Sequence, residues 1–254
     1  MKILYIPTFN KTTEIDSFFQ KNKSETFFEK NPDIIFVSGG DGSLLHAIQE
    51  YQHLNVPFFG IANGTKNFLM NEVSVKDLHD KKFYRFETIE TPTIKIKVKR
   101  RRSNGTKYNI FKAIATNDVV FGNRIMDYNT FYISGIGSFD FDIKGMGLIF
   151  STAIGSTAFF QNNHGKILKD LRNGTIGVAS IVAEKDKAFN EHITLDKKLK
   201  VRIDSERNSC SIYIDGETKV FKLKKGDEVI IERGPSVKLS FKNLDDFYKK
   251  RDNE

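Results

Sequence analysis

One short stretch, VSGGDGSLLHAI at residues 37–48, places a lone carboxylate, Asp41, among three glycines after an apolar run. Glycines between a strand and a helix let the backbone approach a ligand, and the N–H groups at the helix start favour an anion such as phosphate. A carboxylate beside phosphates is repulsive unless it holds Mg²⁺ or accepts a proton from an attacking hydroxyl, and both roles belong to phosphoryl transfer. We therefore expect Asp41 to activate an alcohol while Gly39, Gly40 and Gly42 hold the donor's phosphates. The alternative is a tight turn in which Asp41 caps the next helix.

A second stretch, MGLIFSTAIGSTAFFQNNHG at residues 146–165, runs from an apolar strand into the tetrapeptide GSTA. Its hydroxyls gather around Gly155, and we expect them to bind a polar ligand that the glycine lets approach; they are Ser151, Thr152, Ser156 and Thr157. The alternative is a helix capped by Ser or Thr. A serine nucleophile is disfavoured, because G-x-S-x-G is absent and no histidine stands out as its partner.

A third stretch, ATNDVVF, interrupts an apolar strand with Asn117 and Asp118. An Asn side chain both donates and accepts hydrogen bonds, whereas an ionised Asp only accepts them. That combination suits a ribose or an amide. The alternative is an ordinary strand end or a β-bulge.

The elements that must position these residues change in character along the chain. The runs KILYIP, DIIFVS and VPFFGIA read as buried strands with helical patterns between them, which predicts a parallel, Rossmann-like α/β domain over residues 1–90. From about Thr91 short alternating runs predict an antiparallel β-rich domain over residues 91–235, with the boundary between residues 88 and 93. Residues 236–254 read as a polar C-terminal tail on the surface.

The composition narrows the class of partner. The net charge of +8 suits an anionic ligand, and the densest basic run, residues 95–115, alternates like a β-hairpin with a solvated face, so we expect no nucleic acid. Cys210 is the only cysteine, which excludes an internal disulfide and favours a reducing compartment. Neither a signal peptide nor a membrane span is expected, which favours the cytoplasm. The five histidines show no metal-ligand spacing.

The three stretches, in this order, resemble the NAD kinase family, which shows a GGDG loop, an Asn-Glu pair and a segment like D-G-L-x-x-S-T-P-T-G-S-T-A-Y. The similarity covers about residues 34–240, and IYIDGE at residues 212–217 looks like the family's late DG strand. GGDG alone is shared with diacylglycerol kinase, sphingosine kinase and phosphofructokinase relatives. GGDG together with S-T-x-x-G-S-T-A is much more specific.

The resemblance implies an enzyme that phosphorylates the 2′-hydroxyl on the adenosine ribose of NAD with ATP, giving NADP. Mg²⁺ would come with ATP, and a homo-oligomer (dimer or tetramer) is implied. Carried over by position, Asp41 would be the catalytic carboxylate, and Thr157, Ala158 and Phe159 would line the adenine pocket. The full set of implied NAD-binding residues is Asp41, Gly42, Phe68, Asn117, Asp118, Thr157, Ala158, Phe159 and Asn162, with Asn117 and Asp118 on ribose hydroxyls.

The chain departs from the family pattern at several positions. Met146 stands where the family usually has an Asp that contacts the nicotinamide half, Asp118 replaces Glu, Phe159 replaces Tyr and Asn162 replaces a common Ser. The segment Gly64-Thr65-x-Asn67 instead resembles the G-T-x-N-D-F of bacterial lipid kinases.

Three other functions therefore stay open. A diacylglycerol-type lipid kinase fits the Gly64–Asn67 segment, although lipid kinases lack GSTA. A kinase with another nucleoside-type acceptor is also open. A nucleotide-binding protein without activity fits the loss of the carboxylate at Met146, although Asp41 has little use in a pure binder. The sequence separates neither NAD from NADH as acceptor nor ATP from polyphosphate as donor.

Overall fold

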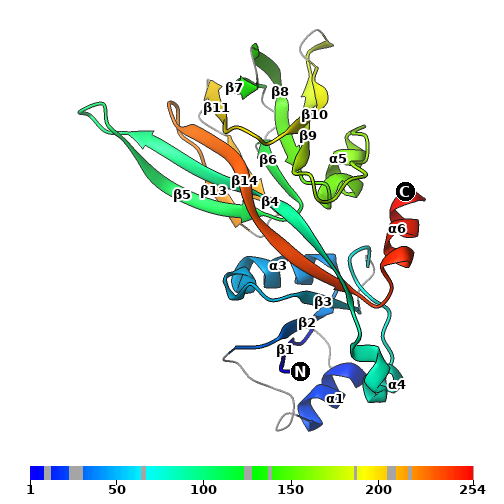
Figure 1. Cartoon of the computed structure of the whole chain (residues 1–254). Helices are drawn as coiled ribbons and strands as arrows, with labels where there is room; N and C mark the ends of the chain where they lie inside the picture. Colours follow the sequence, from blue (N-terminus) through cyan, green and yellow to red (C-terminus); the bar gives the residue numbers. More distant parts are fainter. Residues whose placement is uncertain are drawn as a thin grey trace. The chain divides into compact units, whose positions relative to one another are not determined.

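The computed structural model describes residues 1–8, 13–22, 31–63, 67–122, 128–136, 139–185, 188–204, 210–216 and 219–253. The chain divides into two compact units (Figure 1). The first unit joins Met1–Glu90 to Val237–Glu254, and the second unit is Thr91–Ser236.

The first unit is built on a parallel sheet. Strands β1 (Ile3–Ile6), β2 (Ile34–Gly39) and β3 (Phe58–Ala62) pair in parallel, and the end of β14 (Glu228–Phe241) adds a parallel strand beside β3. All of β2 is buried, as expected for a strand covered on both faces. The predicted α/β fold with a parallel sheet is confirmed.

Helices cover the two faces of this sheet. Phe19 of α1 (Glu14–Lys21) and Leu78 of α4 (Val75–His79) pack with Phe36 and Phe59 on one face. Leu44 of α3 (Asp41–Tyr51) approaches Gly60, whose neighbour Phe59 points the other way along the strand, so α3 covers the opposite face. Two short 3₁₀ turns, η1 (Gln52–Leu54) and η2 (Lys81–Tyr84), complete the connections.

The second unit is antiparallel, which confirms the predicted β-rich part. Its strands are β4 (Glu87–Arg101), β5 (Lys107–Ala115), β6 (Asp118–Gly122), β7 (Asn129–Ile136), β8 (Phe139–Ser151), β9 (Thr175–Ala183), β10 (Asn190–Thr194), β11 (Leu199–Asp204), β12 (Ser211–Ile214), β13 (Lys219–Lys222) and the first part of β14, residues 228–236. Strand β8 is central because it pairs with β6, β7 and β9. The short helices η3 (Gly155–Thr157) and α5 (Phe159–Asn162) follow it.

The basic run forms the predicted hairpin between β4 and β5. Ile94, Ile96 and Val98 are fully buried, and the lysines between them face outward. Glu232 of β14 pairs with Lys97 and also lies 3.6 Å from the Nζ atom of Lys95. The alternation therefore places the apolar side chains in the core and the charged side chains on the opposite, half-buried face.

The structure corrects the expectation that residues 236–254 form a polar tail on the surface. Its first residues complete β14, and Leu244–Asp252 forms helix α6 with Asn243 as the N-cap. Phe247 is buried and stacks on Phe241 with 4.2 Å between ring centroids. One buried aromatic residue within a mostly charged helix gives too weak an apolar stripe for sequence periodicity to reveal.

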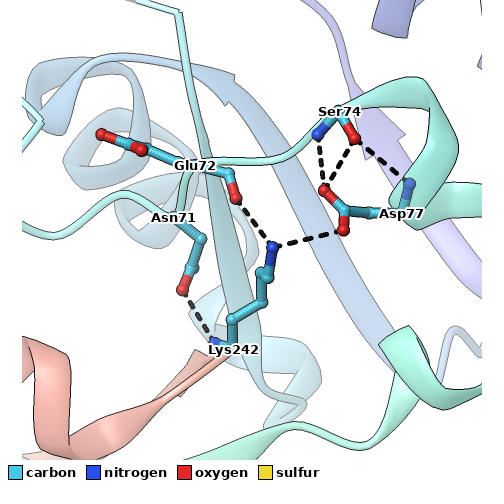
Figure 2. Close-up of polar contacts among 5 residues, drawn as sticks. All are labelled: Asn71, Glu72, Ser74, Asp77 and Lys242. Atoms are coloured by element: carbon cyan, nitrogen blue, oxygen red, sulfur yellow. Dashed lines mark hydrogen bonds and ion pairs between the residues drawn. The ribbon is translucent and has the colours of Figure 1, made fainter.

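Lys242 ties the start of this segment to the first unit (Figure 2). Its backbone N–H donates to Asn71 Oδ1 at 2.9 Å, and its Nζ atom lies 3.3 Å from the Glu72 carbonyl and 3.4 Å from Asp77 Oδ1. Asp77 in turn closes a capping box with Ser74 at the start of α4. These contacts make the C-terminal segment part of the first unit's structure.

In the part of the chain that the structure describes, no helix is both long and apolar enough to cross a membrane.

We expect Phe247→Ala to lower the free energy of unfolding by about 3–5 kcal/mol, because truncation of a buried aromatic leaves a cavity. Lys249→Ala, on an exposed position of the same helix, is the matched control and should change it by less than about 0.5 kcal/mol. Urea denaturation measures both. Equal, small effects would show that Phe247 does not anchor α6 to the rest of the first unit.

Candidate functional site

The glycine turn lies at the carboxyl end of β2. Gly39 has a φ of +150°, a conformation that side chains rarely adopt, and a Cβ atom there would lie 2.4 Å from Ser43 Oγ. Its carbonyl accepts the N–H of Asn63, which follows β3, at 2.8 Å. Gly42, in the first turn of α3, has nothing within 4 Å of the position of a Cβ atom. The turn thus needs glycine at residue 39 for its backbone, and it leaves open space at residue 42.

Asp41 does not cap the helix, so that alternative is wrong. The N-cap of α3 is Gly40, which has no side chain to accept a hydrogen bond. The Asp41 carboxylate instead accepts the N–H of Phe68 at 2.9 Å on Oδ2 and the N–H of Leu69 at 2.8 Å on Oδ1. Because both oxygens are held, the plane of the carboxylate is fixed against a segment 27 residues away.

The backbone of Phe68 therefore lies beside Asp41, and the Phe68 side chain is half-buried. Gly64 and Thr65, which carried the likeness to lipid kinases, lie outside the described residues.

Polar side chains that the sequence analysis missed gather at the same carboxyl edge of the sheet. Asn63 Nδ2 donates to Thr8 Oγ1 at 2.9 Å, and Thr8 Oγ1 shares a hydrogen bond of 2.9 Å with Ser38 Oγ. The Tyr5 hydroxyl donates to Asp16. Burial, reinforced by that bond to Asp16, raises the pKa of Tyr5 above its ordinary value. In open α/β sheets this edge is where ligands bind. The signal in the sequence is that Ser38, Thr8 and Asn63 each stand at the end of an apolar strand or shortly after it.

In the second unit, the segments around Asn117 and Gly155 are joined through their main chains. The Thr152 N–H donates to the Asn117 carbonyl at 2.8 Å, and Thr152 Oγ1 donates to the Thr116 carbonyl at 2.5 Å. A Cβ atom at residue 155 would lie 2.2 Å from the Asn117 carbonyl oxygen. The glycine of GSTA is thus required by this close approach of two backbones.

A further carboxylate, Asp215, holds the same turn. It accepts the N–H of Asn117 at 2.7 Å and of Asp118 at 3.2 Å on Oδ1, and the N–H of Thr116 at 3.0 Å on Oδ2. Asp215 is buried and has a φ of +48°, followed by Gly216 at +73°. The sequence analysis noted the DG pair but gave it no role. Glu217, at the end of the same motif, lies outside the described residues.

Asp118 is 5% exposed, and its pKa is raised to about 7. Burial is the main cause, the nearby charge of Asp215 adds to it, and the Gly216 N–H partly offsets it. Beside it, Asn117 Oδ1 and Thr116 Oγ1 are buried and have no hydrogen-bond partner among the described residues. Buried polar atoms of this kind call for an explanation, and a ligand that supplies donors is one.

The structure corrects the expectation that the hydroxyls around Gly155 bind a ligand, because all four of them bond to main-chain groups inside the protein. Ser151, Thr152 and Ser156 are buried. Ser151 Oγ donates to the Thr152 carbonyl at 3.2 Å, and Ser156 Oγ accepts the N–H of Leu168 at 3.0 Å. A buried hydroxyl needs a partner, and the nearest ones here are main-chain groups. Only Thr157 is half-buried.

The remaining site candidates lie on η3 and α5. Thr157 and Ala158 are half-buried, and Asn162 is exposed at the end of α5. Phe159 is 42% exposed, whereas its neighbour Phe160 is fully buried. The Phe159 ring is therefore accessible for stacking, while Phe160 belongs to the core.

Met146 is half-buried in β8. The register with β9 pairs Gly145 with Ala183 and Gly147 with Ile181, so Val182 stands opposite Met146. Val182 has a φ of +45°, which for a β-branched residue is a genuine outlier.

Within the described ranges, no group of three or more His, Cys, Asp and Glu side chains is placed to hold a metal ion.

Comparison with protein families matches residues 116–242 to the ATP-NAD kinase C-terminal domain. Among curated proteins, the NAD kinase of Rickettsia typhi is 30% identical over 138 residues, and that of Rickettsia canadensis is 33% identical over 138 residues. Each alignment covers 54% of this chain and 51% of the relative, so the chain spans about half the length of the curated relatives it matches.

Two solved structures share the fold at low sequence identity. An NAD kinase from Archaeoglobus fulgidus in complex with ATP has a TM-score of 0.75 and 17% identity, with 100% of this chain and 98% of that chain covered. Yeast NADH kinase complexed with NADH has a TM-score of 0.81 and 16% identity, with 98% and 86% covered.

We expect Gly155→Ala to destabilise the protein and Gly42→Ala to be tolerated. Gly155→Ala forces a Cβ atom against the Asn117 backbone and should lower the free energy of unfolding by about 1–3 kcal/mol or more. Gly42→Ala meets open space inside a helix and should leave it unchanged or raise it by up to about 1 kcal/mol. Thermal melts of the two variants beside the parent protein decide the point. Equal tolerance at both positions would contradict the close approach at Gly155.

Proposed function

The chain belongs to the ATP-NAD kinase family, and on that premise we propose that it transfers the terminal phosphoryl group of ATP to the 2′-hydroxyl on the adenosine ribose of NAD, giving NADP and ADP. The observation that supports this most strongly is the Asp41 carboxylate at the carboxyl end of β2, fixed by the N–H groups of Phe68 and Leu69. A base must be held in one orientation to receive a proton from a bound hydroxyl.

In the proposed reaction the 2′-oxygen forms a bond to the γ-phosphorus of ATP. The bond from that phosphorus to the β,γ-bridging oxygen breaks, ADP leaves, and the 2′-hydroxyl proton passes to Asp41. Mg²⁺ arrives with ATP as part of the substrate, in keeping with its usual binding through phosphates and one or two carboxylates. The backbone of Gly39–Gly42, at the start of α3, would face the donor's phosphates.

The second unit offers groups suited to the nucleoside. The buried Oδ1 atom of Asn117 would accept from a ribose hydroxyl, and Asp118 would bond to the same sugar. The accessible ring of Phe159 would stack on the adenine.

A panel of acceptors with Mg-ATP tests the proposal. NAD, NADH, diacylglycerol and nucleosides are each incubated with the protein, ADP release is followed and the product is identified by mass. A second series replaces ATP with polyphosphate. NADP is the expected product. Phosphorylation of diacylglycerol alone would establish the lipid kinase instead, and binding of NAD with no ADP release would establish a non-catalytic nucleotide-binding protein.

We expect Asp41→Asn to lower turnover by roughly 10²–10⁴-fold, the usual contribution of a positioned general base. The amide keeps one acceptor oxygen, so one of the two N–H groups of residues 68 and 69 loses its partner. We therefore also expect a loss of about 1–3 kcal/mol in stability. Rates are measured well below the melting temperature, where the variant is folded.

Asp77→Asn is the matched control, because it removes a capping carboxylate from the same unit. It should cost about 0.5–2 kcal/mol of stability and leave turnover unchanged. Turnover at the parent level in Asp41→Asn would rule out the role of Asp41 as base.

Phe159→Ala and Phe160→Ala separate ligand stacking from core packing. Truncation of the exposed Phe159 should weaken nucleotide binding by roughly 1–3 kcal/mol, the range for aromatic stacking on bases, with little effect on melting. Truncation of the buried Phe160 should cost about 3–5 kcal/mol of stability. Calorimetric titration with NAD measures the binding. Unchanged affinity in Phe159→Ala would remove it from the adenine pocket.

A further inference from the structure

We propose that Asp215 is a positioning residue of the nucleotide site, which orients Asn117 and Asp118 through their backbone N–H groups. The inference rests on the proposed function insofar as Asn117 and Asp118 bind the ribose. Its structural part stands on contacts within the second unit alone.

The geometry shows how Asp215 fixes the turn. Its two carboxylate oxygens accept three successive backbone N–H groups, those of Thr116, Asn117 and Asp118. The connection is reciprocal, because the Asp215 N–H donates to the Asp118 carbonyl at 3.0 Å. A carboxylate held against three consecutive amides leaves the chain little freedom to rotate, so the side chains of residues 117 and 118 emerge in fixed directions.

The left-handed backbone at residues 215 and 216 supports a specific role for this turn. Asp215 has a φ of +48° and Gly216 a φ of +73°. A non-glycine residue in this region is uncommon, although Asp tolerates it better than most. This conformation brings the Gly216 N–H to the Asp118 side chain while the Asp215 side chain turns to the amides.

The charges facing Asp118 are few. Among the described residues, the charged group that acts on it is Asp215, and the polar group is the Gly216 N–H. Both residues are buried, at 5% exposure each. Two buried carboxyl groups that act on each other electrostatically disfavour double ionisation. Asp215 accepts three N–H bonds, which stabilise its charged form, so the proton resides on Asp118.

The protonation of Asp118 has consequences for folding and for binding. With its pKa raised to about 7, the folded protein binds this proton more tightly than the unfolded chain. The resulting stability is fully present below the ordinary carboxyl pKa and is lost as pH rises through about 7. A neutral Asp118 can donate to a sugar oxygen and does not repel the ligand's phosphates. NAD affinity should therefore fall as pH rises through about 7, by at most about tenfold per pH unit for one linked proton.

Two variants separate the charge of Asp215 from its geometry. Asp215→Asn removes the charge but retains an acceptor oxygen for the N–H groups of Asn117 and Asp118, which share Oδ1, and loses only the bond from Thr116. Asp215→Ala removes all three bonds. The matched control is Asp227→Asn, since Asp227 is as buried as Asp215 and lies in the same unit, but bonds to Arg100 at 2.7 Å and to the Lys224 N–H at 2.8 Å.

The first measurement needs no ligand. Aspartate carboxyl groups labelled with ¹³C are titrated by NMR, and Asp118→Asn assigns the signal. We expect the Asp118 midpoint near pH 7 in the parent protein, a fall of about one pH unit or more in Asp215→Asn, and no change in Asp227→Asn. A midpoint at the ordinary carboxyl value, or one that stays in place in Asp215→Asn, would overturn the proposal.

The second measurement is NAD affinity by calorimetry across the same pH range. In Asp215→Asn the decline with pH should move to lower pH together with the NMR midpoint, and in Asp215→Ala affinity should fall at every pH because the turn is no longer held. Asp227→Asn should keep the parent profile even if it melts earlier. A profile unmoved by Asp215→Asn overturns the link to binding. If the parent protein binds no NAD while the NMR midpoint moves as expected, the proposed function fails and the structural role of Asp215 stands.

Discussion

The close approach of the Asn117 carbonyl to Gly155 is the constraint on which the hydrogen bonds between residues 116–118 and residues 151–156 depend. With 2.2 Å between that oxygen and the position of a Cβ atom, no side chain fits at residue 155. The contact brings Thr152 within reach of two carbonyls of the opposite segment. The four hydroxyls that the sequence analysis assigned to a ligand bond to main-chain carbonyls instead, because hydroxyls in such surroundings take the partners within reach.

In both units a carboxylate holds a loop whose backbone N–H groups have no partner in a regular β-sheet ladder. In each, a carboxylate accepts backbone N–H groups from a segment far away in the sequence. Asp41 holds residues 68 and 69, and Asp215 holds residues 116–118, which lie 97 to 99 positions away. A carboxylate suits this role because it accepts several bonds and donates none. Asp16 and Asp77, in contrast, close local capping boxes three residues away.

Much of the fold could be predicted because it follows from patterns along the chain. The fully apolar β2 indicates a covered parallel strand, and the alternation from Ile94 to Val98 indicates a half-buried one. What the sequence left undecided depends on contacts between distant segments. Nothing near Asp41 shows that its partners are the amides of residues 68 and 69, and the DG pair at residue 215 reads as a turn whether or not its carboxylate bonds elsewhere. The helix over Leu244–Asp252 has one buried aromatic residue, too little for a periodic signal.

Asp41 and Asp118 have different tasks in the proposed function, and the surroundings of their carboxyl groups differ accordingly. Asp41 has to accept a proton, and the N–H groups of residues 68 and 69 hold it as an acceptor. Asp118 has to lie near a ligand that carries phosphates, where a second full negative charge would oppose binding. Burial beside Asp215 disfavours that charge. The side chain of Asp is one methylene shorter than that of Glu. It keeps the Asp118 carboxyl group within hydrogen-bonding reach of the Gly216 N–H, beside the turn at residues 215 and 216.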